Sequence, residues 1–107
     1  MIVRQVASLA EFTPDKMGKT TIAMAESLFV GLNAFEPGQE HVAHAHAGQD
    51  KLYLVLEGSA EVRIGEEETV LSAGDAAMAR SGVVHAIRNP GPNRMIVLAV
   101  LAPPPKK

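Results

Sequence analysis

The sequence predicts an all-β fold, either a sandwich or a barrel, and three observations support this prediction. Short runs of strand length follow one another from residue 28 to residue 89. Glycine, proline and asparagine turn signals separate these runs. Residues 60–64 alternate in polarity, so that Glu61 and Arg63 face water while their neighbours face a core. Many short strands with closely spaced turns are typical of sandwiches and barrels.

Each predicted strand ends at a turn signal. The predicted strands span residues 28–35, 40–46, 52–57, 60–64, 69–72, 76–80 and 85–89. The signals that follow them are Pro37-Gly38, Ala47-Gly48, Gly58, Gly65-Glu66, Gly74-Asp75, Ser81-Gly82 and Asn89-Pro90-Gly91. Asp75 and Asn89 are expected to serve in these turns rather than in chemistry.

The apolar run 95–101 predicts a last strand that is covered on both faces. It is too short to span a bilayer, and it lacks the alternation of a strand with one solvated face. One face serves the core, and the other needs cover from residues 22–24 or from a second subunit. A symmetric homodimer is therefore expected.

Length and composition predict a single domain in the cytoplasm. The 107 residues suffice for one core barrel over about residues 20–102, with a short N-terminal arm over 1–19 and a solvated proline-rich tail over 103–107. The net charge of −2, with both signs well mixed, indicates no nucleic-acid partner and no membrane surface. Cysteine is absent, and the first residues do not resemble a signal peptide.

Three histidines indicate a metal site. His44 and His46 stand two residues apart in a predicted strand, so their side chains point to the same face. His85 offers a third nitrogen from a separate strand. Imidazole suits zinc, iron, nickel and copper and tolerates manganese, so we expect one divalent transition metal. His41, three residues before His44, is expected on the opposite, solvent-facing side of the strand.

These histidines lie in two motifs that resemble those of the cupin family. The first runs Gly38, five residues, His44-Ala45-His46, four residues, Lys51, six residues and Gly58. The second runs Gly74, five residues, Arg80-Ser81-Gly82, two residues, His85, three residues and Asn89, and 15 residues separate the two. The resemblance implies a double-stranded β-helix, which is the cupin jelly-roll barrel. It also implies a dimer, since proteins similar to small cupins usually pair through an outer sheet.

The chain departs from the cupin pattern at two positions. Lys51 stands where the pattern has a metal-binding glutamate, and Arg80 stands where it has a turn proline. An ammonium group repels a cation, so Lys51 removes the fourth ligand. Three alternatives remain: the amide oxygen of Gln49, which we favour; the three histidines with water; or Asp50, if a bulge shifts the register.

Four side chains are predicted to form a pocket beside the metal. If Lys51 and Arg80 reach the barrel mouth, they attract a small molecule that carries a carboxylate or an enol. The alternative is that both extend outward to water, and for Arg80 this alternative is the stronger. Tyr53 shares a strand face with Lys51 and is a candidate proton donor, with core packing as the alternative. Met78 is expected in the barrel interior.

Three classes of function remain open from the sequence. The first is a metal-dependent enzyme on a small organic substrate; the resemblance implies dioxygenase, decarboxylase or isomerase chemistry, with a dioxygenase-like oxidoreductase as the leading form. The second is a binding or sensor module without turnover, which the missing glutamate and the lack of an evident acid–base pair favour. The third is a metal-free barrel used in assembly. Fold does not decide among them.

Overall fold

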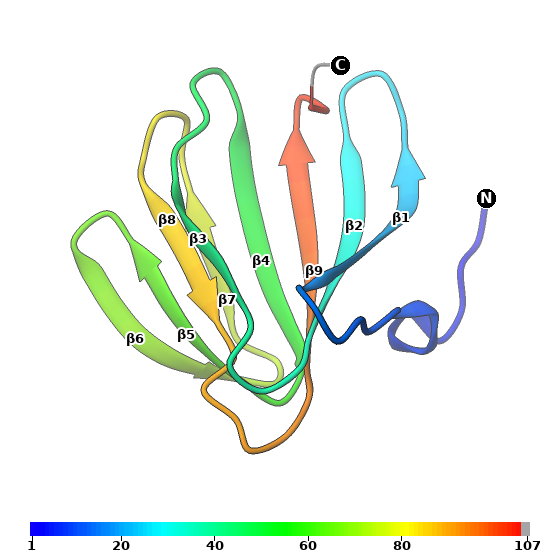
Figure 1. Ribbon diagram of the computed structural model, residues 1–107. Helices are drawn as coiled ribbons and strands as arrows, with labels where there is room; N and C mark the ends of the chain where they lie inside the picture. The colour runs from blue at the N-terminus through cyan, green and yellow to red at the C-terminus, as the bar shows by residue number, and fades with distance from the viewer. Residues whose placement is uncertain (106–107) are drawn as a thin grey trace.

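The computed structural model describes residues 1–105, and within them nine strands form two antiparallel sheets (Figure 1). A short 3-10 helix, η1 (Val6–Leu9), precedes the strands. The strands are β1 (Gly18–Met24), β2 (Phe29–Phe35), β3 (Glu40–His44), β4 (Asp50–Glu57), β5 (Ser59–Ile64), β6 (Glu67–Ser72), β7 (Ala76–Ala79), β8 (His85–Arg88) and β9 (Met95–Ala102). The predicted all-β class is confirmed.

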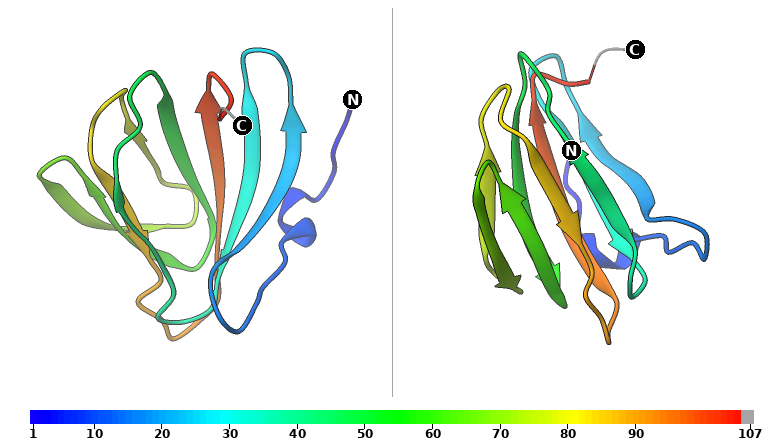
Figure 2. Two further views of the ribbon diagram at one scale, coloured as in Figure 1. Left: turned by 45° about the horizontal axis from the view of Figure 1, so that its top comes forward. Right: turned by 60° about the vertical axis from the view of Figure 1, so that its left-hand side comes forward.

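The two sheets face each other around a shared interior (Figures 1 and 2). One has the order β1-β2-β9-β4-β7 and the other the order β3-β8-β5-β6. Strands that are far apart in the sequence therefore lie side by side, as β2 and β9 do, and this arrangement is the predicted jelly-roll barrel. Across residues 1–105, no helix is long and apolar enough to cross a membrane.

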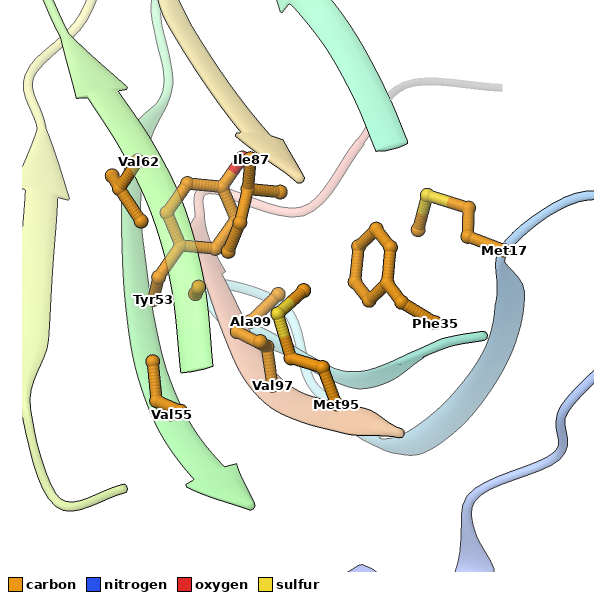
Figure 3. Close-up of a cluster of buried hydrophobic side chains, with 10 residues drawn as sticks. Met17, Phe35, Tyr53, Val55, Val62, Ile87, Met95, Val97 and Ala99 are labelled. Atoms are coloured by element: carbon orange, nitrogen blue, oxygen red, sulfur yellow. The ribbon is translucent and has the colours of Figure 1, made fainter. Parts of the chain in front are cut away.

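Alternate residues of the five-stranded sheet build the core. In the centre of this sheet Tyr53 pairs with Ala99 and Val55 with Val97, and all four side chains point inward. Figure 3 shows how they meet side chains from the opposite sheet. The buried apolar cluster comprises Met17, Phe35, Tyr53, Val55, Ala60, Val62, Ile87, Met95, Val97 and Ala99.

The N-terminal part of the chain differs from the prediction. Residues 18–24 form β1, which pairs with β2 at the edge of the five-stranded sheet. The stretch 22–24 therefore extends this sheet instead of covering β9. The sequence of this strand lacks a clear apolar–polar alternation, and its register shifts between Thr21 and Ala23. Figure 1 shows the segment that contains η1 beside β1.

The outer face of the five-stranded sheet is apolar and only partly covered. Leu52, Leu54, Leu98 and Val100 are half-buried there. Met78 pairs with Leu52 and shares this face with 50% exposure, so the prediction that it fills the barrel interior is wrong. The register of β7 against β4 sets this orientation, because a shift of one residue would turn Met78 inward.

Turn residues hold the ends of the strands as expected. The amide of Asn89 donates to the carbonyls of Phe35 and Asn93 and its oxygen accepts from the N–H of Gly91, which confirms its role in a turn. Asp75 likewise accepts the N–H of Ser72. Gly58 joins β4 to β5 with a φ of +80°, a conformation that suits glycine because it has no Cβ.

Candidate metal centre and ligand cavity

Three histidines from one end of a strand pair meet between the sheets. His44 ends β3 and pairs with His85, which begins β8, while His46 follows in the loop to β4. One ring nitrogen from each of the three residues lies within 4.8 Å of the others. The ring centroids of His44 and His85 are 4.2 Å apart, and those of His44 and His46 are 4.7 Å apart. The structure therefore brings together the three histidines that the sequence singles out.

Backbone hydrogen bonds set the tautomers of two of these rings. The Nδ1 of His44 lies 2.6 Å from the carbonyl oxygen of Val42, and the Nδ1 of His85 lies 2.9 Å from that of Val83. Since a carbonyl only accepts, each Nδ1 carries the proton and each Nε2 keeps its lone pair. Both Nε2 atoms are buried without a hydrogen-bond partner among the described residues. Such an arrangement is typical of imidazole that binds a metal.

Burial favours the neutral form of the His44 and His85 rings. Desolvation lowers the pKa of His44 and His85, and the charges of Lys51 and the neighbouring rings lower it further. In both residues the bond to the backbone carbonyl opposes this effect. Neutral imidazole is the form that binds a metal, so the lone pairs are available near neutral pH.

His41 lies against this cluster, and its predicted solvent-facing position is wrong. The pairing of β3 with β8 shifts register between His41 and His44, so the strand does not alternate regularly there. The His41 ring centroid lies 4.2 Å from that of His44, and its Nδ1 is buried without a partner among residues 1–105. Burial, together with Lys51, lowers the pKa of His41 to about 3.

Lys51 and Tyr53 both point from β4 into the interior. Lys51 is 5% exposed, and its Nζ lies 4.9 Å from the centroid of the Tyr53 ring. Burial and the nearby Lys19 lower the pKa of Lys51 to about 8. Tyr53 is fully buried, and its hydroxyl has no hydrogen-bond partner among the described residues. Burial raises the pKa of this hydroxyl. The centroid of the Tyr53 ring lies 6.0 Å from that of His85. Of the two orientations left open for Lys51, the structure shows the inward one.

The alternative fourth ligands are held by other contacts. The side-chain amide of Gln49 donates from Nε2 to the carbonyl of Pro103 at 3.0 Å, so this side chain is tied to the C-terminal segment. The carboxylate of Asp50 accepts the N–H of Ser81 and does not belong to the group of converging nitrogens. No bulge occurs in the pairing of β4 at this residue, so the condition for Asp50 to coordinate is not met.

A cavity of about 730 Å³ adjoins the histidines at the end of the molecule where the β3–β4 loop and the C-terminal segment lie (Figure 1). Its lining includes Lys19, His41, His46, Gln49, Lys51, Leu101 and Pro103 to Pro105. Pro103 to Pro105 form part of its wall, while Pro103 and Pro105 are also exposed, as expected for a solvated tail; Lys106 and Lys107 of that tail lie outside the described residues. Arg80 is exposed and does not line the cavity.

A second hollow of about 580 Å³ lies over the four-stranded sheet. Charged side chains of both signs line it, among them Glu61, Arg63 and Arg88. Glu61 and Arg88 form an ion pair there at 2.8 Å. The hollow contains none of the four histidines, so the cavity beside the histidines is the better candidate for a ligand site.

Sequence reasoning did not assign two of the polar side chains, Lys19 and His41, to the cavity that they line. Lys19 belongs to β1, and no motif or alternation in the sequence singles it out. His41 was visible as a histidine, but its orientation depends on the irregular pairing of β3. The spacing of three residues between His41 and His44 is the one sequence signal that could have suggested the inward position of His41, because a bulge places two such residues on one face of a strand.

Comparisons with known proteins agree with this geometry. Residues 31–101 match the family model described as the cupin domain. A solved structure, TT1209 from Thermus thermophilus, has a TM-score of 0.93 at 40% identity and covers 98% of this chain and 100% of that one. A Klebsiella pneumoniae protein with a double-stranded β-helix domain has a TM-score of 0.87 at 29% identity, covering 96% and 90%.

A curated relative extends the match along nearly the whole chain. The tetracenomycin polyketide synthase protein TcmJ of Streptomyces glaucescens is 34% identical over an alignment of 100 residues, and the alignment covers 91% of this chain. The match covers 63% of TcmJ, so this chain is similar to only part of that protein. The family model, the structural likeness and the paired histidine motifs lead to one conclusion: the chain belongs to the cupin family.

Proposed function

We propose that the protein binds one divalent transition metal through His44, His46 and His85. The observation that carries this proposal is the pair of buried, unpartnered Nε2 lone pairs of His44 and His85 beside His46, within the described part of the chain. Buried polar atoms without partners are costly, and a metal would satisfy both of these at once. The nitrogen donors suit iron, manganese, nickel, zinc or copper. When bound, such an ion supplies a Lewis acid for a ligand oxygen.

The proposed ligand is a small organic molecule with a carboxylate or an enolic oxygen. Lys51 faces the cavity with a positive charge that an anionic oxygen would balance. Burial keeps the hydroxyl of Tyr53 protonated, and it has no partner within residues 1–105, so it has a hydrogen bond to donate to a group that enters beside His85. The likeness to TcmJ, named as a polyketide synthase protein, supports an oxygen-rich organic ligand.

Metal content is the first test of this proposal. We expect near-stoichiometric metal on the wild type by mass spectrometry and its loss in the His44→Ala and His46→Ala variants. His41→Asn is the matched control, because the nitrogens of His41 lie outside the converging group, and it should keep its metal. A wild type that remains metal-free after incubation with each of the candidate metals would refute the proposal.

We propose turnover of the ligand, in a dioxygenase-like or related reaction, as the leading function, with binding alone as the second candidate. One observation favours the second: the cavity lining contains no aspartate or glutamate among the described residues, so no carboxylate stands ready as a general base. Oxygen uptake by the iron-loaded protein with a panel of enolisable keto acids and catechols separates the two. Uptake above that of the His46→Ala variant supports the enzyme, whereas ligand binding without uptake or product supports the binding module.

We also propose a homodimer that pairs through the apolar outer face of the five-stranded sheet. Its support is the half-buried row of leucine and valine side chains on this face together with the exposed Met78. Sedimentation at micromolar concentration should give the mass of a dimer, and Met78→Arg should shift it toward the monomer. Val70→Arg, at a site with 59% exposure on the other sheet, is the control and should remain dimeric. A monomeric wild type would end this proposal.

A further inference from the structure

The cavity beside the histidines carries positive charge that comes from lysines and not from the three histidines that would hold a metal. Two lysines line it, Lys51 from β4 and Lys19 from β1, and none of its lining residues is acidic among the described residues. Two ammonium groups that face the same space repel each other, and this repulsion contributes to the lowered pKa of Lys51. Such a pair attracts anions into the cavity.

Of the two lysines, Lys51 is the stronger evidence for an anionic ligand. It is 5% exposed, and no salt bridge joins its Nζ to a carboxylate within residues 1–105. Lysine is almost never buried to this degree without a partner. The Tyr53 ring, 4.9 Å from Nζ, offsets only part of the cost through a cation–π contact. The charge therefore lacks a counter-ion that a ligand could supply.

His41 adds a neutral polar group to the same wall. It lines the cavity together with the two lysines, and its Nδ1 is buried without a partner in the described part of the chain. His46 lines the cavity as well. A single molecule in this space can thus place one oxygen beside His46 and a second group beside the lysines and His41.

We propose that Lys19 and Lys51 form an anion subsite separate from the three histidines, so that the ligand is a small molecule with two anionic groups, such as a dicarboxylate or a carboxylated enol. One anionic group pairs with the ammonium groups, and the other lies at the histidines. The second half of this statement rests on the proposed function, whereas the subsite itself rests on the cavity and on the buried Lys51. Arg80, which is exposed, takes no part.

Calorimetric titration at pH 7 tests the subsite. The probes are succinate, glutarate and adipate, and their matched monocarboxylates are butyrate, valerate and caproate. On protein loaded with Ni²⁺, we expect the best dicarboxylate to bind about tenfold or more tightly than its monocarboxylate, since a charge-assisted contact is gained. Lys51→Met and Lys19→Met should each reduce this preference, and Lys51→Arg should retain much of it. Arg80→Met is the control and should leave the preference unchanged.

The same titrations on metal-free protein separate the two proposals. If Ni²⁺ does not bind but succinate or a longer homologue still binds in a way that Lys51→Met abolishes, the metal proposal fails and the subsite stands. If Ni²⁺ binds stoichiometrically but dicarboxylates gain nothing over monocarboxylates, the subsite is refuted. A preference that survives both lysine substitutions, or the absence of binding by any probe to either form, refutes it as well. Lys19 is exposed, so Lys19→Met keeps the test valid should a change at Lys51 disturb folding.

Discussion

Replacing Lys51 by methionine should stabilise the metal-free protein, because a buried charge is exchanged for an apolar side chain of similar length. Burial and Lys19 lower the pKa of Lys51 from 10.5 to about 8, and a change of this size corresponds to about 3 kcal/mol against the charged form. The cation–π contact with Tyr53 is lost in the variant. Allowing for that loss, we expect the free energy of unfolding at pH 7 to rise by about 2 kcal/mol.

The effect has a pH dependence with a definite sign. Between the folded pKa of about 8 and the unfolded value of 10.5, the unfolded chain binds more protons, so wild-type stability rises with pH. The Lys51→Met variant lacks this group, and its advantage over the wild type should shrink as the pH rises from about 7 to about 9.5. Urea unfolding followed by circular dichroism measures both quantities and suits a chain without tryptophan.

The control is Arg80→Met, which removes an exposed charge and should change stability by no more than about 0.5 kcal/mol. The reasoning is refuted if Lys51→Met is equal to or less stable than the wild type at neutral pH. It is equally refuted if the difference between the two proteins is the same at both ends of this pH range, since the cost would then not lie in the charge.

Four other perturbations test separate parts of the structure. His85→Ala should abolish the rise in melting temperature that Zn²⁺ gives the wild type. This rise corresponds to about 4 kcal/mol of added stability at a metal concentration roughly a thousandfold above Kd. Scanning calorimetry measures the melting temperature, and an undiminished rise in the variant would contradict the prediction. Tyr53→Phe removes a hydroxyl without a partner in the described part of the chain, so urea unfolding should show metal-free stability unchanged within about 1 kcal/mol or increased, while glutarate affinity falls; a clear loss of stability would reveal a partner for the hydroxyl. Between pH 6.5 and the folded pKa of His41 of about 3, the unfolded chain binds more protons than the folded one, so the stability of the metal-free protein should fall as the pH falls. The His41→Asn variant should lose less stability than the wild type between about pH 7 and about pH 4. Equal decreases of the urea midpoint in the two proteins would contradict this prediction. Gly58→Ala combines a φ of +80° with a Cβ 2.5 Å from the carbonyl oxygen of Arg94 and should cost more than about 2 kcal/mol, whereas Gly74→Ala, with a φ of +96° and open space around it, should cost about 1 kcal/mol; similar losses in both would contradict the contact argument.

Much of the fold was predictable because local signals agree with the tertiary structure. The glycine and proline turns mark the ends of most strands, and the alternation of residues 60–64 matches the exposed Glu61 and Arg63 of β5. β1 was missed because its residues show no regular alternation, and its strand form depends on pairing with β2. Edge strands show a weaker apolar–polar alternation in their sequence, because only part of their surface packs against a core.

The candidate site was predictable as far as spacing determines it. The three converging histidines follow from their motifs, yet the orientations of Met78 and Lys51 depend on how β4 pairs with β7 and β9. A sequence does not specify that register, and one residue of shift reverses every side chain. The inward position of His41 was not predicted for a related reason: the rule of alternation assumes a regular strand, and the β3–β8 pairing is irregular.

The proline segment that forms part of the cavity wall has a consequence for how the protein is produced. Pro103 to Pro105 line the cavity, and the amide of Gln49 donates to the carbonyl of Pro103, so a peptide fused after residue 107 is joined to this wall through two residues. A polyhistidine tag placed there would bring foreign imidazoles near His46 and add competing ligands for the metal. Met1 is 90% exposed and does not line the cavity, so an N-terminal, cleavable tag suits measurements of metal stoichiometry.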